Sequence, residues 1–180
     1  YENKGKINKV KDRDWHIRLS NYGWTKLNKK WIIQFNKLSK HKQKNSLFGA
    51  LDCGGGGDCL FNCISYALNE GENIDAEGLR IGLCEYITES KFNTIIDIYR
   101  ILKETGEFEE IWDPDITSFE EFKELLKEGG ENYWADSLIL DFLKEFLNIN
   151  IIVLYNNDIT NEYYHYRMLD KYDVDKNTIV

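Results

Sequence analysis

Apolar residues recur at helical spacing along much of the chain, most clearly between residues 132 and 148 (NYWADSLILDFLKEFLN). Residues three and four positions apart share one side of an α-helix, so this segment is predicted to be a helix with one buried face. The apolar residues of that face are Ala135, Leu138, Ile139, Phe142, Leu143, Phe146 and Leu147.

The same spacing predicts further helices. Their ranges are residues 24–43, 59–69, 78–89 and 93–103. The first would be a basic amphipathic helix with Trp24, Leu27, Trp31, Phe35 and Leu38 on its apolar side. Ser118 followed by Glu121 is a capping-box signature, so we expect a helix to begin there and to end at the Gly129 and Gly130 pair.

Strand-like segments follow the last predicted helix. Residues 148–155 (NINIIVLY) are rich in β-branched side chains and are bounded by Asn156 and Asn157, which predicts a short strand. Residues 163–169 and 177–180 are interpreted as later strand or loop pieces. Helices followed by strands indicate an α+β (or α/β-like) fold, with helices packed around a small β-sheet.

The composition is that of a globular protein. The 180 residues are 42% hydrophobic and 30% charged, which is enough for one domain with a real core. No apolar run approaches the length that spans a bilayer, and the polar start is not a signal peptide. The chain starts at Tyr1 and ends in the strand-like KNTIV, which we interpret as a fragment or a processed product.

Charge is distributed unevenly. Residues 1–48 hold 13 Lys and Arg against three acidic residues, which gives a net charge of +10. The remaining residues therefore carry a net charge of −18, and the two parts sum to the chain's −8. The acidic body suits a basic partner and disfavours nucleic acid. The basic N-terminal arm could contact nucleic acid, an acidic protein surface or the chain's own body.

The four cysteines are Cys53, Cys59, Cys63 and Cys84, and none forms a C-x-x-C pair. A structural zinc site therefore has weak support. Because the chain is not a small, disulfide-dense one, we expect free thiols and a reducing, cytoplasmic compartment.

Four consecutive glycines occupy positions 54–57, two residues before Cys59 and the predicted helix. Glycines adopt positive φ easily and leave peptide N–H groups uncovered, and a helix N-terminus adds positive potential. A cysteine hydrolase needs these features to stabilise a thiolate and the oxyanion of an acyl intermediate.

Other uses of the glycines were weighed. A phosphate loop would require a Lys followed by Ser or Thr, and a dinucleotide fingerprint would require a glycine at Cys59. Metal binding would use Cys53, Cys59 and Cys63 at spacings that no common site has. A flexible turn followed by a buried core cysteine remains open at this point.

Two blocks resemble the ovarian tumour (OTU) family of cysteine proteases. GGGGDCLFNCISYAL is similar to the family's nucleophile motif D-G-x-C-[LF]-[FY], with Gly57, Asp58 and Cys59 at matching positions. The segment 131–154, with Trp134 and Ala135 at its head, resembles the family's W-[GA]-x helix-strand block. The resemblance covers residues 47–180, which would form an OTU-like domain after an arm of residues 1–46. The glycine-only motif is most similar to OTU-like proteins of large DNA viruses.

The resemblance implies a papain-type fold and a thiol-dependent deubiquitinase that cuts the isopeptide bond after ubiquitin's C-terminal glycine. Cys59 would be the nucleophile, and the backbone N–H groups of Gly57, Asp58 and Cys59 would form the oxyanion hole. The implied partner is ubiquitin or a ubiquitin-like protein, with no cofactor and no metal. The alternative is an inactive OTU-like binding or scaffold protein of a virion or another assembly.

Two features depart from the family pattern. The motif's Asp, three residues before the cysteine, is Gly56 here, and Asp52 is the nearest preceding acid. A general base must also be found among His16, His41 and His165. His165 followed by Tyr166 fits the family's H-[YF] pair, but it follows the predicted strand too early. We therefore favour a catalytic histidine past Val180 and interpret His16 and His41 as surface residues.

Overall fold

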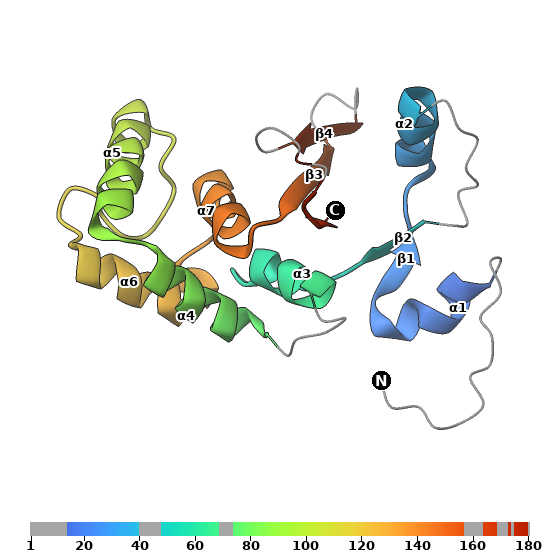
Figure 1. Ribbon diagram of the computed structural model, residues 1–180, viewed down its shortest axis with the longest axis horizontal. Helices are drawn as coiled ribbons and strands as arrows, with labels where there is room; N and C mark the ends of the chain where they lie inside the picture. The colour runs from blue at the N-terminus through green and yellow to red at the C-terminus, as the bar shows by residue number, and fades with distance from the viewer. Residues whose placement is uncertain are drawn as a thin grey trace. The chain divides into compact units, whose positions relative to one another are not determined.

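The computed structural model describes residues 14–39, 48–68, 74–156, 164–168, 173 and 175–179 (Figure 1). The chain divides into two compact units. Unit 1 comprises Tyr1–Cys53 and Tyr155–His165, and unit 2 comprises Gly54–Leu154 and Tyr166–Val180. The predicted boundary between residues 46 and 47 stays a prediction.

Unit 1 contains short helices and one small antiparallel ribbon. Its elements are α1 (Trp15–Leu19), the 3-10 helix η1 (Ser20–Tyr22), β1 (Trp24–Lys26), α2 (Lys29–Ser39) and β2 (Gly49–Leu51). The prediction of one helix over residues 24–43 is wrong at its start. Trp24 pairs with Leu51 across the β1–β2 ribbon, so cross-strand bonding overrides the helical spacing of Trp24 and Leu27.

Unit 2 contains five α-helices among its described residues. They are α3 (Cys59–Leu68), α4 (Ala76–Tyr86), α5 (Glu89–Thr105), α6 (Phe119–Glu128) and α7 (Ser137–Leu147), with the 3-10 helix η3 (Gly130–Asn132) after α6. Each predicted helix in this part of the chain is present, with ends shifted by a few residues. Asn69, the predicted last residue of the second helix, lies outside the described residues.

Capping side chains set where these helices begin. Asp75, Thr88 and Asp136 each accept a hydrogen bond from a backbone N–H of the first turn of α4, α5 and α7. The predicted capping box of α6 is confirmed, because Ser118 and Glu121 bond to each other's backbone N–H groups. Because these bonds join residues only two or three positions apart, the helices could be predicted from the sequence.

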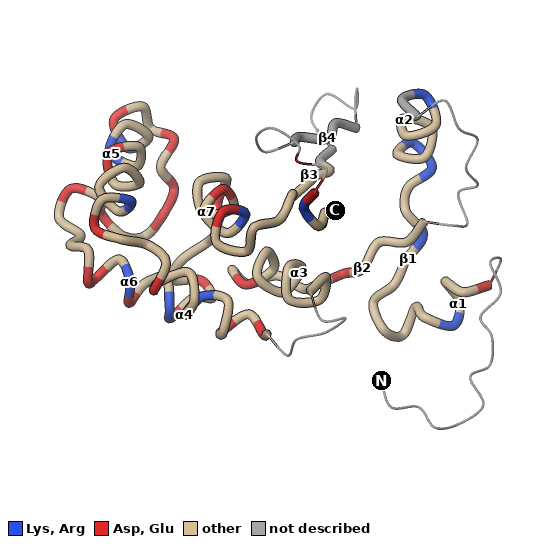
Figure 2. Tube along the Cα trace, in the orientation of Figure 1, with Lys and Arg blue, Asp and Glu red and all other residues tan. Residues whose placement is uncertain are grey.

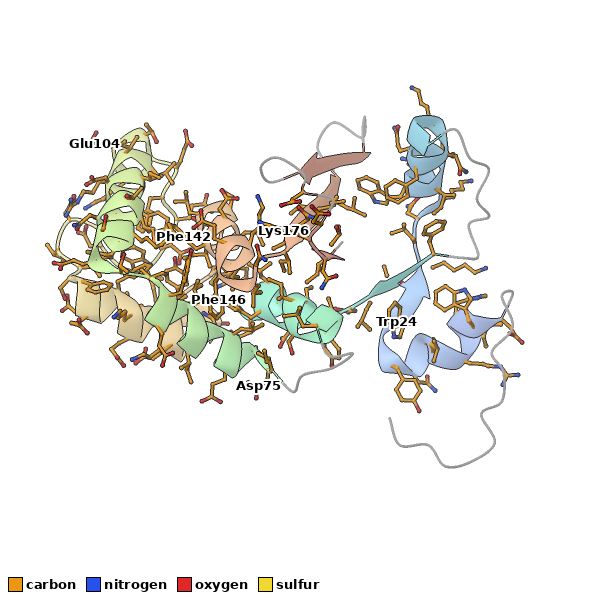
Figure 3. The ribbon with its side chains drawn as sticks, viewed as in Figure 1. Trp24, Asp75, Glu104, Phe142, Phe146 and Lys176 are labelled. Atoms are coloured by element: carbon orange, nitrogen blue, oxygen red, sulfur yellow. The ribbon has the colours of Figure 1, made fainter. Side chains whose placement is uncertain are left out.

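The core of unit 2 lies between its helices. The predicted apolar face of α7 packs into this core, with Ile139 and Leu143 fully buried. Phe146 of the same face lies over Gly82 of α4, where a side chain in place of the glycine would crowd its ring (Figure 3). Rings from four segments join the core nearby, namely Tyr99, Phe108, Trp112, Phe122 and Tyr133.

A three-stranded sheet completes the described chain. Its strands are β3 (Asn150–Asn156), β4 (Tyr164–Met168) and β5 (Thr178–Ile179), in the order β4-β3-β5, and β5 runs parallel to β3. The buried Asn150 side chain donates to the carbonyls of Asp173 (2.7 Å) and Lys176 (3.2 Å), which ties the turn before β5 to β3. The predicted strands are therefore present, and the α+β class is confirmed. No described helix has the length and apolar character needed to cross a bilayer.

Cys84 is the cysteine that the core encloses. Its thiol is buried on α4 and donates to the carbonyl of Lys123 (3.5 Å), and burial raises its pKa from 9.0 to about 11.

At pH 8 we expect a thiol reagent to modify the exposed Cys63 rapidly and Cys84 only after unfolding, as peptide mass spectrometry would show. Because the buried Cys84 thiol keeps its proton more tightly in the native state than in the unfolded chain, it adds to the free energy of unfolding. This contribution should be complete below pH 9 and be lost as the pH rises towards 11. Rapid labelling of native Cys84 at pH 8 would contradict the packing described above.

Candidate active site

The glycine-rich loop before α3 adopts a conformation that few other residues allow. Gly54, Gly56 and Gly57 all have positive φ values, of 83°, 75° and 92°. A side chain at Gly54, Gly55 or Gly56 would meet open space, whereas a Cβ at Gly57 would collide with the backbone of Gly130. The loop is therefore open on one side and closely packed at Gly57.

Arg80 of α4 holds the closely packed end of this loop. Its side chain is 3% exposed, and its guanidinium lies 4.0 Å from the centre of the Phe61 ring. The guanidinium donates to Asp58 Oδ1 (2.9 Å from Nε and 2.6 Å from Nη2) and to the carbonyls of Gly57 (3.1 Å), Leu126 (3.0 Å) and Tyr133 (3.4 Å). A buried cation is tolerated only when its donors are satisfied in this way.

Asp58 links the loop to the segment that follows α6. Its Oδ1 accepts from the backbone N–H of Gly130 (3.2 Å) as well as from Arg80. Its own carbonyl accepts from the N–H of Asn62, in the first turn of α3. We call the Asp58–Arg80 pair, with the carbonyl of Gly57 and the N–H of Gly130, the loop clamp.

Cys59 is the first residue of α3 and is partly exposed. The buried residues of this helix are Phe61, Ile64 and Ser65, so Cys59 does not belong to the core. A buried core cysteine is therefore the wrong interpretation of this position, and Cys84 has that role instead. The N–H groups of the first helical turn have no partners within the helix, which gives Cys59 a locally positive surrounding.

The three histidines considered for the general base are described to different extents in the structure. His165 lies in β4, but its side chain falls outside the described residues, as does all of His41. His16, interpreted from sequence as a surface residue, is only partly exposed, and its Nδ1 is buried without a hydrogen-bond partner among the described residues. The identity of the general base stays a prediction.

Arg80, Gly130 and Tyr133 were not predicted from the sequence as parts of the site. One signal was available for Arg80, because it adjoins Leu79 and lies at helical spacing from Leu83, which puts a charge on an apolar helix face. Gly130 was interpreted only as a helix end. Asp52, considered as a replacement for the missing motif acid, lies in unit 1, where its N–H donates to the carbonyl of Gly23 (3.0 Å).

The described residues contain no group of three or more His, Cys, Asp or Glu side chains arranged to hold a metal ion. What the site offers is a partly exposed thiol at a helix N-terminus, beside backbone amides that the loop clamp holds in place. This arrangement suits attack by a thiolate on a carbonyl carbon.

Comparison with known proteins gives one match. The model of a family described as OTU-like cysteine protease matches residues 54–180. The matched span begins at Gly54 in the glycine loop, which is also the first residue of unit 2. No curated protein and no solved structure matches the chain significantly.

Proposed function

The chain belongs to the OTU-like cysteine protease family, and from this we propose that it is a thiol-dependent deubiquitinase with Cys59 as its nucleophile. The observation that carries the proposal is the position of Cys59, at the start of α3 and directly after a loop whose peptide groups the loop clamp fixes. The papain-type α+β fold expected from the sequence agrees with the family match.

The loop clamp supports an oxyanion hole in the preceding peptide units. In a trans peptide the C=O and N–H groups point in opposite directions. Because Arg80 holds the carbonyl of Gly57, the N–H of Asp58 points away from the guanidinium. We propose that this N–H and those of Gly57 and Cys59 receive the oxyanion that forms on the substrate.

The proposed reaction follows from these groups. The Cys59 thiolate adds to the carbonyl carbon of the isopeptide bond, and the carbonyl electron pair moves to the oxygen. Collapse of this intermediate breaks the C–N bond, and the protonated general base gives its proton to the leaving amine. Water, activated by the same base, then hydrolyses the thioester and regenerates the thiol.

The proposed substrate is ubiquitin or a ubiquitin-like protein. Residues 49–180 carry a net charge of −18, which would suit a basic protein face around the tail that is cleaved. We also propose a reducing, cytoplasmic site of action, since none of the four cysteines is joined to another in a disulfide. The glycine-only loop motivates the further proposal of a viral source.

The test is covalent capture by a ubiquitin probe with a C-terminal electrophile, in parallel with probes made from ubiquitin-like proteins. We expect an adduct with one of these probes, and its identity would give the substrate class. If the folded protein, including a chain extended past Val180, is captured by none of them, the deubiquitinase proposal is wrong. The inactive binding or scaffold protein would then be the better account.

The general base is proposed to be a histidine that follows Val180 in a longer chain, with His165 as the alternative. In a chain extended past Val180, we expect His165→Ala to retain probe capture within a fewfold of the parent rate. His41→Ala serves as a matched control outside the OTU-like match. Loss of capture in His165→Ala alone, with the fold intact, would instead assign the base to His165.

A further inference from the structure

A second surface of the chain, in unit 1, is rich in basic side chains. Residues 15–51 contain no Asp or Glu, although the chain has 31 acidic residues in 180 positions. Protein surfaces normally intersperse charges of both signs. The basic residues of this acid-free segment are Arg18, Lys26, Lys29, Lys30, Lys37, Lys40, Lys42 and Lys44.

Helix α2 shows that these lysines form a face. Trp31 and Ile32 are buried, and the ring of Trp31 stacks on Phe35 at 5.9 Å, so this side of the helix is covered. Lys29 and Lys37 lie on the opposite side and are exposed. We call Lys29, Lys30, Ile33 and Lys37 the lysine face of α2.

Other basic residues of unit 1 are also exposed. Arg18 in α1 and Lys26 in β1 are both accessible, and Figure 2 shows Lys and Arg along α1, β1 and α2. Ile33, in the middle of the lysine face, is 60% exposed and gives it one apolar contact. The described part of unit 1 thus presents exposed basic side chains from three elements, of which Arg18 pairs with Asp14 (3.8 Å).

This arrangement works against the stability of α2. Lys29 begins the helix, and the first turn of the helix has no acidic residue. The N-terminal end of a helix dipole is positive, so lysines there are unfavourable for folding. A bound polyanion would remove this repulsion.

The residue types indicate which polyanion fits. Lysine is depleted at protein–protein interfaces, where arginine and aromatic residues are enriched, but it is a common ligand of phosphate. Insertion into a lipid surface would need the apolar side of α2, where Trp31 and Ile32 are already buried. We therefore infer that the lysine face of α2 binds the phosphodiester backbone of a nucleic acid. This inference does not rest on the proposed hydrolase function.

The experiment measures binding of the full chain to a labelled single-stranded RNA and a labelled DNA duplex over a range of salt concentrations. We expect dissociation constants on the order of 10 μM at low salt, rising steeply with salt concentration. The triple variant Lys29→Gln, Lys30→Gln and Lys37→Gln should bind at least about tenfold more weakly. Its log–log salt slope should be smaller in magnitude by about 2 for the single strand or about 3 for the duplex.

The matched control is Lys123→Gln, Lys127→Gln and Lys176→Gln, which makes the same change in net charge within unit 2. It should bind as the parent does. Both variants should keep the parent's circular dichroism, and the triple variant in α2 should melt no lower than the parent, because it removes lysines from the helix N-terminus. Absence of binding at low salt, or equal weakening by the control, would overturn the inference. Competition by poly-glutamate as effective as that by unlabelled nucleic acid would also overturn it, and would assign the face to an acidic protein.

Discussion

Cys59→Ala is expected to abolish hydrolysis of a ubiquitin C-terminal amide, lowering kcat/KM by roughly 10⁴-fold or more. The substitution removes the sulfur that would form the acyl intermediate, and neither the glycine loop nor the loop clamp can replace it. The measurement is release of a fluorogenic amine from the ubiquitin C-terminus, in whichever chain length supports activity in the parent.

Cys63→Ala is the matched control for this prediction. Cys63 lies one turn further along α3 and is exposed, so its loss should change kcat/KM by less than about twofold and leave stability within about 0.5 kcal/mol. Cys59→Ala should also stay folded, because the residue is only partly buried. If Cys59→Ala kept its activity while Cys63→Ala lost it, the proposal that Cys59 is the nucleophile would be wrong.

Arg80→Met is expected to lower the free energy of unfolding by about 3 kcal/mol. Methionine keeps an unbranched chain of similar length, but it leaves the carbonyls of Gly57 and Leu126 without their buried donor. This value is at the low end of the destabilisation expected when one partner of a buried ion pair is removed. The reason is that the Asp58 side chain is 40% exposed, so water can solvate part of its charge. Urea denaturation would measure the change.

Arg100→Met tests whether this effect is specific to the buried position. Arg100 is 43% exposed and pairs with the exposed Asp97 and Asp115, so its loss should cost less than about 1 kcal/mol. Equal destabilisation by the two variants would contradict a special role for the loop clamp.

The loop clamp is also expected to have a catalytic effect that a loss of stability alone would not produce. Under conditions where Arg80→Met remains folded, we expect kcat for the ubiquitin amide to fall at least about tenfold. Alkylation of Cys59 by iodoacetamide, which forms no oxyanion, should stay within about threefold of the parent rate. Equal losses in both reactions would indicate that Arg80 maintains the fold of the site and does not position the loop amides.

Features that depend on neighbouring residues could be predicted from the sequence. The capping box at Ser118, the apolar face of α7 and the helix that starts at Cys59 all depend on residues a few positions apart, so they could be predicted without a fold. The glycine loop was likewise visible, because glycine is the residue that adopts positive φ at little cost.

Contacts between residues that are distant in the sequence could be identified only in the folded structure. Trp24 forms a strand because it meets Leu51 across a ribbon, although its local spacing fits a helix. Asp58 bonds to Arg80, 22 residues away, and to Gly130, 72 residues away, and neither pairing has a local signature in the sequence. A buried charge needs partners, but the chain must fold before those partners can be identified. This is why Cys59 could be proposed as the nucleophile from the sequence, whereas the groups that hold its loop could not be identified there.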